Sequence, residues 1–226
     1  MPQAVQVATV ATTPAADVSP IQVYLAADND FLIPLVFPQF QIHVLDDYKD
    51  TWFGQKIKIE FPKAPLLGHA GVLLINGKTG ESKYYEYGRY KGPGPAGRVQ
   101  KGSIPNVKIV AGHITESSLK KTLRQISIGH GQSGNIKGVV LRGAVYANAL
   151  VWLDGKFAEN SDKTRKAYDL GNHNCVTFAA ELAESVGFSA PFRSRTVAPT
   201  LYMTQFQLSE IDLEYSFADD KLEIDE

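Results

Sequence analysis

The sequence predicts an α+β fold, in which strands and helices occupy separate parts of the chain rather than alternating. Short segments rich in β-branched and aromatic residues gather in the first half, and segments with helical periodicity gather in the second half. The chain has 226 residues, of which 44% are hydrophobic and 21% are charged. This size and composition are those of an ordinary globular protein with one large domain or two small ones.

Strands are predicted where the sequence is β-branched, aromatic or alternating. Residues 55–61, QKIKIEF, alternate strictly between polar and apolar side chains, which is typical of a strand with one wet face. The segments HAGVLLI (69–75) and SKYYEYGRY (82–90) flank the turn cluster NGKTGE, so we expect a β-hairpin centred on residues 76–80. The other predicted strands are residues 21–27, 40–46 and 106–112.

Three helices are predicted in the second half of the chain. Thr115 is a good N-cap for a helix over residues 116–128, in which Leu119, Leu123 and Ile126 fall on one face. A second helix is expected near residues 144–159, where apolar residues recur at helical spacing. The third begins at Cys175, after which apolar residues follow at three- and four-residue intervals, and Gly187 ends it.

The predicted organisation is an arm followed by one domain. Residues 1–19 are rich in Ala, Thr, Val and Pro with almost no charge, which is typical of a flexible arm. We expect residues 20–226 to form a single domain with its core at about residues 60–190. Within it, residues 91–105 are dense in Gly and Pro and predict an irregular surface loop, and the acidic tail 219–226 predicts a frayed end.

Charge and composition exclude several functional classes. The chain has 23 basic and 24 acidic residues, which argues against nucleic acid or an anionic membrane as the main partner. No apolar run is long enough to span a bilayer, so we expect no stable membrane insertion. A single cysteine excludes an internal disulfide framework and a multi-cysteine metal site, and the HExxH motif of zinc hydrolases is absent. We therefore expect no metal and no cofactor.

Cys175 stands where a polar loop turns into an amphipathic segment, GNHNCVTFAAEL (171–182). Asn172 or Asn174 can cap the helix, which leaves the thiol in the first turn, where unpaired N–H groups and the helix dipole favour an anion. Such a position lowers the pKa of a thiol and makes the thiolate available as a nucleophile. The alternative is a small structural residue, because the apolar stripe of the same helix would bury a cysteine equally well.

A cysteine nucleophile needs a base, and the chain has five histidines. His69 opens an apolar strand and has small neighbours that leave room around its ring, whereas His43 falls inside a predicted strand and His130 in a Gly-rich loop. Glu86 lies among aromatic residues on the next strand of the hairpin, where a carboxylate is unfavourable unless it is paired. It is either a glutamate on a wet strand face or the group that orients the imidazole of His69.

The segments GHAGVLLI, YYEYGRY and NHNCVTFAAEL together resemble the permuted papain-like superfamily of NlpC-type amidohydrolases. In that superfamily the chain order is a histidine that opens a strand, a polar residue on the neighbouring strand, and a cysteine that follows Asn at a helix start. His69, Glu86 and Cys175 match this order and would be the catalytic residues. The resemblance implies a permuted papain-like α+β fold, with an antiparallel β-sheet packed against helices and the catalytic cysteine at a helix N-terminus.

The same segments look most like antibacterial effectors of type VI secretion systems. Such an effector is delivered by the secretion apparatus, which agrees with an N-terminus that lacks the basic start and apolar core of a secretory signal. The resemblance implies a toxin made in the cytoplasm that acts in the periplasm of a target bacterium. Its implied partners are a peptidoglycan substrate, a cognate immunity protein and a component of the secretion apparatus.

The leading functional hypothesis is a cysteine amidase or peptidase that hydrolyses peptidoglycan peptide bonds. Two alternatives stay open. One is a lipid acyl hydrolase or acyltransferase that uses the same Cys–His pair, for which the apolar segment PLVFPQF (34–40) is a hint. The other is a non-enzymatic binding protein in which Cys175 is buried and far from His69.

Overall fold

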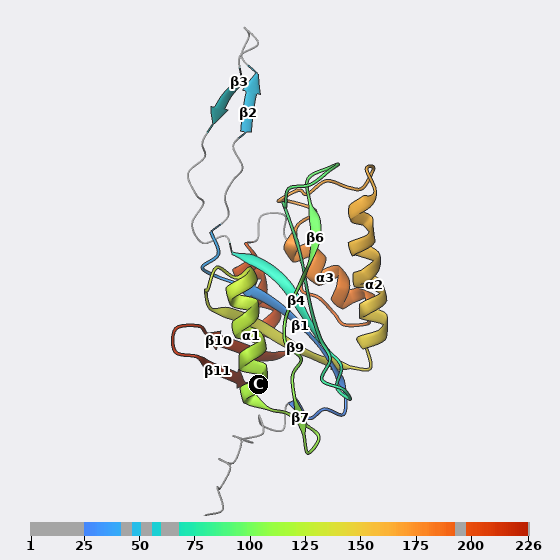
Figure 1. Ribbon diagram of the computed structural model, residues 1–226, viewed down its shortest axis with the longest axis vertical. Coiled ribbons are helices and arrows are strands. Elements are labelled where there is room, and N and C mark those ends of the chain that lie inside the picture. Colours follow the sequence, from blue (N-terminus) through green and yellow to red (C-terminus); the bar gives the residue numbers. More distant parts are fainter. Residues whose placement is uncertain (1–24, 42–46, 51–55, 60–67, 193–197, 226) are drawn as a thin grey trace, which may run out of the picture.

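The computed structural model describes residues 25–41, 47–50, 56–59, 68–192 and 198–225 of the chain. In these ranges a seven-stranded sheet forms the centre of the molecule, and helices cover both of its faces (Figure 1). Every neighbouring pair of strands in this sheet is antiparallel. The predicted α+β class and the antiparallel sheet packed against helices are therefore confirmed.

The strands of the large sheet lie in the order β11-β10-β9-β1-β4-β5-β6. Their bounds are β1 (Asp30–Phe37), β4 (His69–Ile75), β5 (Ser82–Gly88), β6 (Arg98–Gly102), β9 (Ile136–Gly143), β10 (Ile211–Ser216) and β11 (Lys221–Asp225). Two small sheets pair β2 (Asp47–Asp50) with β3 (Lys56–Ile59) and β7 (Ile109–Val110) with β8 (His113–Ile114). The helices are α1 (Glu116–His130), α2 (Tyr146–Ala158), α3 (Cys175–Ser185) and α4 (Pro199–Gln207), and a 3-10 turn, η2 (Glu159–Ser161), extends α2.

Strand β1 lies in the centre of the sheet and is buried on both faces. Because side chains alternate along a strand, Leu32 and Val36 face a core shared with α2, α3 and α4, whereas Phe31 and Ile33 face a second core shared with α1. Full burial of an aliphatic or aromatic side chain contributes about 1.5–3 kcal/mol. The two cores therefore fix the helices on opposite faces of one sheet.

The predicted hairpin is confirmed as β4 and β5, which pair in a register that places Gly71 opposite Glu86. Tyr84 belongs to the core on the α1 side, so Glu86, two residues further along β5, lies on the same face. Ala70 of β4 and Cys175 of α3 share the other core. The start of β4, the start of α3 and the end of α1 are therefore brought toward one region of the sheet.

Two predictions about irregular segments are wrong. The acidic tail is not frayed, because β11 pairs with β10 and places Ile224 in the core on the α1 side. The segment 91–105 is not wholly an irregular loop, since it contains β6, which pairs with β5. The outer edge of β6 is closed by Asn160, whose amide accepts from the backbone N–H of Val99 at 3.0 Å and donates to its carbonyl at 2.8 Å.

The predicted helices are confirmed as α1, α2 and α3, and Gly187 follows the end of α3 with a φ of +96°. Helix α1 runs two residues further than expected, so His130 is its last residue rather than part of a loop. Thr115 stands at the N-cap of α1, but its hydroxyl donates to Oγ of Ser118 instead of accepting a backbone N–H.

The remaining strand predictions have mixed outcomes. Strand β3 confirms a strand within residues 55–61, whereas the strand expected over residues 106–112 is reduced to the two residues of β7. Residues 1–24 and 42–46 lie outside the described ranges, and with them the predicted arm, His43 and most of the strands expected at 21–27 and 40–46.

Candidate active site

Cys175 is the first residue of α3 and is held there by a capping box. The side-chain oxygen of Asn174 accepts from the backbone N–H of Val176 at 2.9 Å and of Thr177 at 3.2 Å. In return Oγ1 of Thr177 accepts from the backbone N–H of Asn174 at 2.8 Å. This reciprocal cap fixes the start of the helix, so the thiol lies in the positive field of the helix N-terminus.

His69 is the first residue of β4, and its imidazole forms a hydrogen bond with Cys175. The backbone N–H of Ala70 and the side chain of Tyr168 also form hydrogen bonds with the sulfur. Gly68 precedes the histidine with a φ of +75°, where an added Cβ would lie 2.9 Å from Oγ1 of Thr200. A glycine is therefore needed at the turn that brings His69 to the sulfur.

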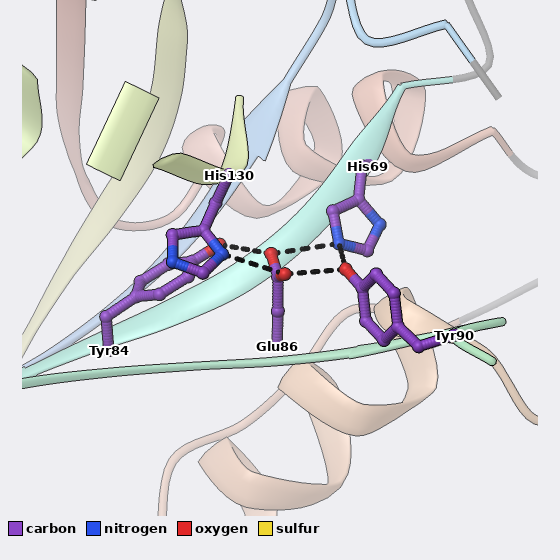
Figure 2. A network of polar contacts seen from close by, with 5 residues as sticks. All are labelled: His69, Tyr84, Glu86, Tyr90 and His130. Carbon is purple, nitrogen blue, oxygen red and sulfur yellow. Dashed lines mark hydrogen bonds and ion pairs between the residues drawn. The ribbon is translucent and has the colours of Figure 1, made fainter. Parts of the chain in front are cut away.

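Glu86 presents its carboxylate to the other side of the imidazole. Its Oε2 lies 3.1 Å from Nε2 of His69 (Figure 2). Because Nε2 faces the carboxylate, Nδ1 is the ring nitrogen left to interact with the sulfur. Glu86 is 2% exposed, His69 is 5% exposed and Cys175 is 2% exposed. The structure thus brings the three residues singled out in the sequence into one buried hydrogen-bonded chain.

Three further residues complete the surroundings of the carboxylate, and the sequence did not indicate them as site residues. Tyr84 donates to Oε2 of Glu86 at 2.9 Å, and Tyr90 donates to Oε1 at 2.6 Å and lies 3.2 Å from Nε2 of His69 (Figure 2). Nδ1 of His130 lies 2.9 Å from Oε1. Tyr84 could have been found from its position two residues before Glu86 on one strand face, whereas no local signal marks His130.

Two glycines leave space for this network. A Cβ added at Gly71 would lie 2.2 Å from the hydroxyl oxygen of Tyr84, and one added at Gly102 would lie 2.8 Å from Nε2 of His130. Real Cβ atoms do not approach other atoms so closely, so a side chain at either position would displace a partner of Glu86. The strands on both sides of β5 thus leave room for the carboxylate's partners.

The pKa values of the three residues are shifted in the directions that an ion pair requires. Burial alone would lower the pKa of His69, but its hydrogen bonds to Cys175 and Glu86 and the charges of both outweigh burial and raise it to about 10. Burial would raise the pKa of Cys175, but the hydrogen bond and charge of His69 lower it. Burial likewise opposes ionisation of Glu86, and its contacts with His130 and His69 hold its pKa well below the usual range. Near neutral pH this geometry favours a thiolate, an imidazolium and a carboxylate in a row.

Two other features bear on the class of site. Within the described ranges, no group of three or more His, Cys, Asp or Glu side chains is arranged to hold a metal ion. Among the same residues, no helix has the length and apolar character needed to cross a membrane.

The fold and the site together define an α+β protein with a buried Cys–His–Glu chain where a helix start meets a sheet. The particular family follows from comparison: a family model described as "Type VI secretion system effector TseH-like" matches residues 32–188, and the chain belongs to this family of secreted effectors. The resemblance to type VI effectors is therefore confirmed.

The similarity of the chain to a solved structure agrees with this family assignment. The chain is similar to the crystal structure of the type VI secretion system effector TseH, with 46% sequence identity and a TM-score of 0.76. The similarity covers 88% of this chain and 98% of the TseH chain. No curated protein sequence matches the chain.

Proposed function

We propose that this effector is a cysteine amidase or peptidase that hydrolyses peptide bonds of peptidoglycan. Cys175 is the nucleophile, His69 is the general base and acid, and Glu86 orients the imidazole. The observation that carries the proposal is the buried hydrogen-bonded chain from Cys175 through His69 to Glu86, with the thiol pKa lowered and the imidazole pKa raised to about 10.

The arrangement supports acyl transfer in two steps. The thiolate of Cys175 attacks the amide carbonyl carbon and a C–S bond forms, while the imidazolium of His69 gives its proton to the leaving amine as the C–N bond breaks. A water molecule then loses a proton to His69 and attacks the thioester carbonyl carbon, and the C–S bond breaks, which releases the acid and restores the thiolate and the imidazolium. The positive field at the N-terminus of α3 favours the negative oxygen that develops in both steps.

Membership of a secreted effector family supports a target outside the producing cell. Peptidoglycan lies in the periplasm of a target bacterium, and its stem peptides supply amide bonds for the proposed chemistry. The balanced charge of the chain gives no support for nucleic acid as a substrate. A cognate immunity protein and a component of the secretion apparatus are the partners that this proposal requires.

The two alternatives have weaker support. Segment 34–40, the hint for a lipid substrate, is largely core, since Leu35, Val36 and Phe37 are fully buried in β1. The binding-protein hypothesis expects Cys175 to be buried and far from His69. The cysteine is buried, but it shares a hydrogen bond with the histidine.

The test combines toxicity with product analysis. We expect toxicity when the protein carries a fused signal sequence that directs it to the periplasm, no toxicity when it stays in the cytoplasm, and no toxicity from a periplasmic Cys175→Ala variant. Purified protein incubated with isolated sacculi should produce new amine and carboxyl ends in muropeptides, measured by mass spectrometry. Free fatty acid from phospholipid vesicles with intact muropeptides would favour the lipid hydrolase, and identical behaviour of wild type and Cys175→Ala would favour the binding protein.

A further inference from the structure

A cavity of about 270 Å³ is bounded by the end of α2, the loop that follows it, one side of α3, and strands β5 and β6. This volume accommodates a group of several non-hydrogen atoms, since one water molecule takes about 30 Å³ of the liquid. Its charged and titratable lining residues are Lys156, Glu159, Arg165, Lys166, His173 and Glu181.

The cavity adjoins the sulfur through Tyr168 and α3. The Tyr168 side chain forms a hydrogen bond with Cys175, and its ring packs on Tyr87, a lining residue, with 5.5 Å between ring centroids. Phe178 also lines the cavity and follows Cys175 by three residues, which is about 4.5 Å along a helix axis. An extended substrate spans about 3.3–3.6 Å per residue, so a residue next to the attacked carbonyl can reach the cavity.

The charges of the lining favour an anion. Lys156 pairs with Glu159 at 3.0 Å, and the guanidinium of Arg165 donates to backbone carbonyls, which fixes the wall without neutralising the charge. For Lys166, the described part of the chain supplies no hydrogen bond or ion pair. Burial lowers the pKa of His173, and the charges of Lys166 and Lys156 lower it further, while the charges of Glu159 and Asp169 oppose them, so both lysines lie close enough to act on this ring.

Tyr87 adds a donor to the inner wall. Its side chain is 6% exposed, and its hydroxyl is buried without a hydrogen-bond partner among the described residues. An added Cβ at Gly97 would lie 2.2 Å from this hydroxyl, so the glycine keeps the space beside it open. A buried hydroxyl without a partner is unfavourable, and an acceptor that enters next to it would relieve that cost.

We propose that this cavity is a substrate subsite for a residue that carries a free carboxylate and flanks the scissile amide. Lys166 supplies the attracting charge and Tyr87 supplies a hydrogen-bond donor. Three cationic and two anionic side chains line the cavity, so its small positive excess suits one carboxylate rather than a polyanion. The inference rests on the proposed amidase function and narrows its substrate class to amides beside a free carboxylate.

The test uses two alkylating probes that differ by one charge, N-bromoacetyl-alanine and N-bromoacetyl-alaninamide, each in D and L forms. In both, the thiolate of Cys175 attacks the bromoacetyl carbon, a C–S bond forms and bromide leaves. The rate of each probe with Cys175 is divided by its rate with free cysteine. We expect this relative rate to be roughly three- to tenfold higher for N-bromoacetyl-alanine than for N-bromoacetyl-alaninamide, which is the effect of one or two partly exposed ion pairs. Lys166→Gln should remove this preference, and Lys163→Gln, in the same loop but outside the cavity lining, should keep it.

Equal relative rates for the acid and the amide would overturn the subsite, as would a preference that survives in Lys166→Gln. A sulfur that neither probe alkylates would also overturn it, because the cavity would then not communicate with the nucleophile. None of these readouts depends on turnover. Digestion of sacculi by the wild-type protein decides the amidase function separately, so failure of the subsite can be told from failure of the amidase function.

Discussion

Glu86 joins two histidines: its Oε2 lies 3.1 Å from Nε2 of His69, and its Oε1 lies 2.9 Å from Nδ1 of His130. Each oxygen also accepts one tyrosine hydroxyl, from Tyr84 at Oε2 and from Tyr90 at Oε1 (Figure 2). The carboxylate is therefore held from four directions in a buried environment, where hydrogen bonds to a charged group are strong. Its orientation toward His69 depends on partners from different elements, and each can be removed separately.

The first prediction concerns the charge of this carboxylate. Glu86→Gln keeps the size of the side chain but replaces one acceptor oxygen with an amide that donates, so it cannot satisfy all four contacts. We expect turnover of peptidoglycan to fall roughly 100-fold while the protein stays folded, since the histidine loses the group that orients it and stabilises its positive form. Glu81→Gln, at a half-buried glutamate just before β5 that pairs with Lys83, is the matched control and should retain activity. If Glu86→Gln turns over sacculi as fast as the wild type, another residue orients His69.

The second prediction tests whether His130 helps to position Glu86 through its hydrogen bond or only fills space beside it. His130→Gln can still donate a hydrogen bond to Oε1 of Glu86, whereas His130→Leu cannot. A hydrogen bond to a charged group contributes about 1.5–3 kcal/mol, so we expect kcat to fall at least about tenfold in His130→Leu, with KM unchanged and with partial recovery in His130→Gln. Equal kcat values for the leucine variant and the wild type would limit His130 to a structural role.

The local parts of the site could be predicted because their signals lie in neighbouring residues. The Asn before Cys175 marks a helix start, the turn at residues 76–80 marks a hairpin, and alternation along β5 assigns Glu86 to one face. The contact between Glu86 and His130 joins residues 44 positions apart and depends on how α1 packs on the sheet. No pattern within either segment contains that information.

The central strand β1 was not predicted, for a different physical reason. Its segment FLIPLVF is a continuous apolar run without alternation, because helices bury both faces, and it contains Pro34, which normally argues against a central strand. The pairing of β1 with β9 is recorded at Leu32 and Leu35 but not at the proline between them. Proline has no backbone N–H to donate, and Pro34 therefore stands at a position where β1 and β9 are not paired. Strands β9 and β10 and helix α4 were also not predicted; β9 pairs with β1, β10 pairs with β9, and α4 packs on both β9 and β1.

The third prediction tests the space that glycine leaves for the network. In Gly71→Ala the new Cβ would lie 2.2 Å from the Tyr84 hydroxyl, so the tyrosine must move away from Glu86. Overpacking of this kind costs about 1–3 kcal/mol of unfolding free energy. Gly155→Ala is the control, because a Cβ there meets no atom within 4 Å and alanine in a helix favours folding by up to about 1 kcal/mol. Urea unfolding of both variants measures the difference, and a Gly71→Ala protein as stable as Gly155→Ala would contradict this crowding around Tyr84.

The fourth prediction concerns pH and starts from the two pKa shifts. The pKa of His69 is raised from 6.5 to about 10, so its contribution to stability is complete below pH 6.5 and is lost as the pH rises through about 10. The pKa of Cys175 is lowered from 9.0, so its contribution is complete above pH 9.0 and is lost as the pH falls through the lowered value. Between pH 6.5 and 9.0, His69 and Cys175 together hold one proton in both the folded and the unfolded protein. This proton is on the imidazole of His69 in the folded protein and on the sulfur of Cys175 in the unfolded chain.

These shifts predict a plateau in the unfolding free energy between about pH 6.5 and 9, with lower stability on both sides. Cys175→Ala removes the thiolate, so the pKa of His69 should fall from about 10 toward the value that burial and Glu86 set. While this pKa stays above 6.5, stability should decrease from pH 6.5 up to the new pKa and then level off. Urea unfolding across this range, with an NMR titration of the His69 ring in both proteins, measures the effect. A wild-type profile that declines from about pH 6.5 as the variant does would mean that the thiol stays protonated at neutral pH. The nucleophile would then need His69 to remove its proton during the attack rather than before it.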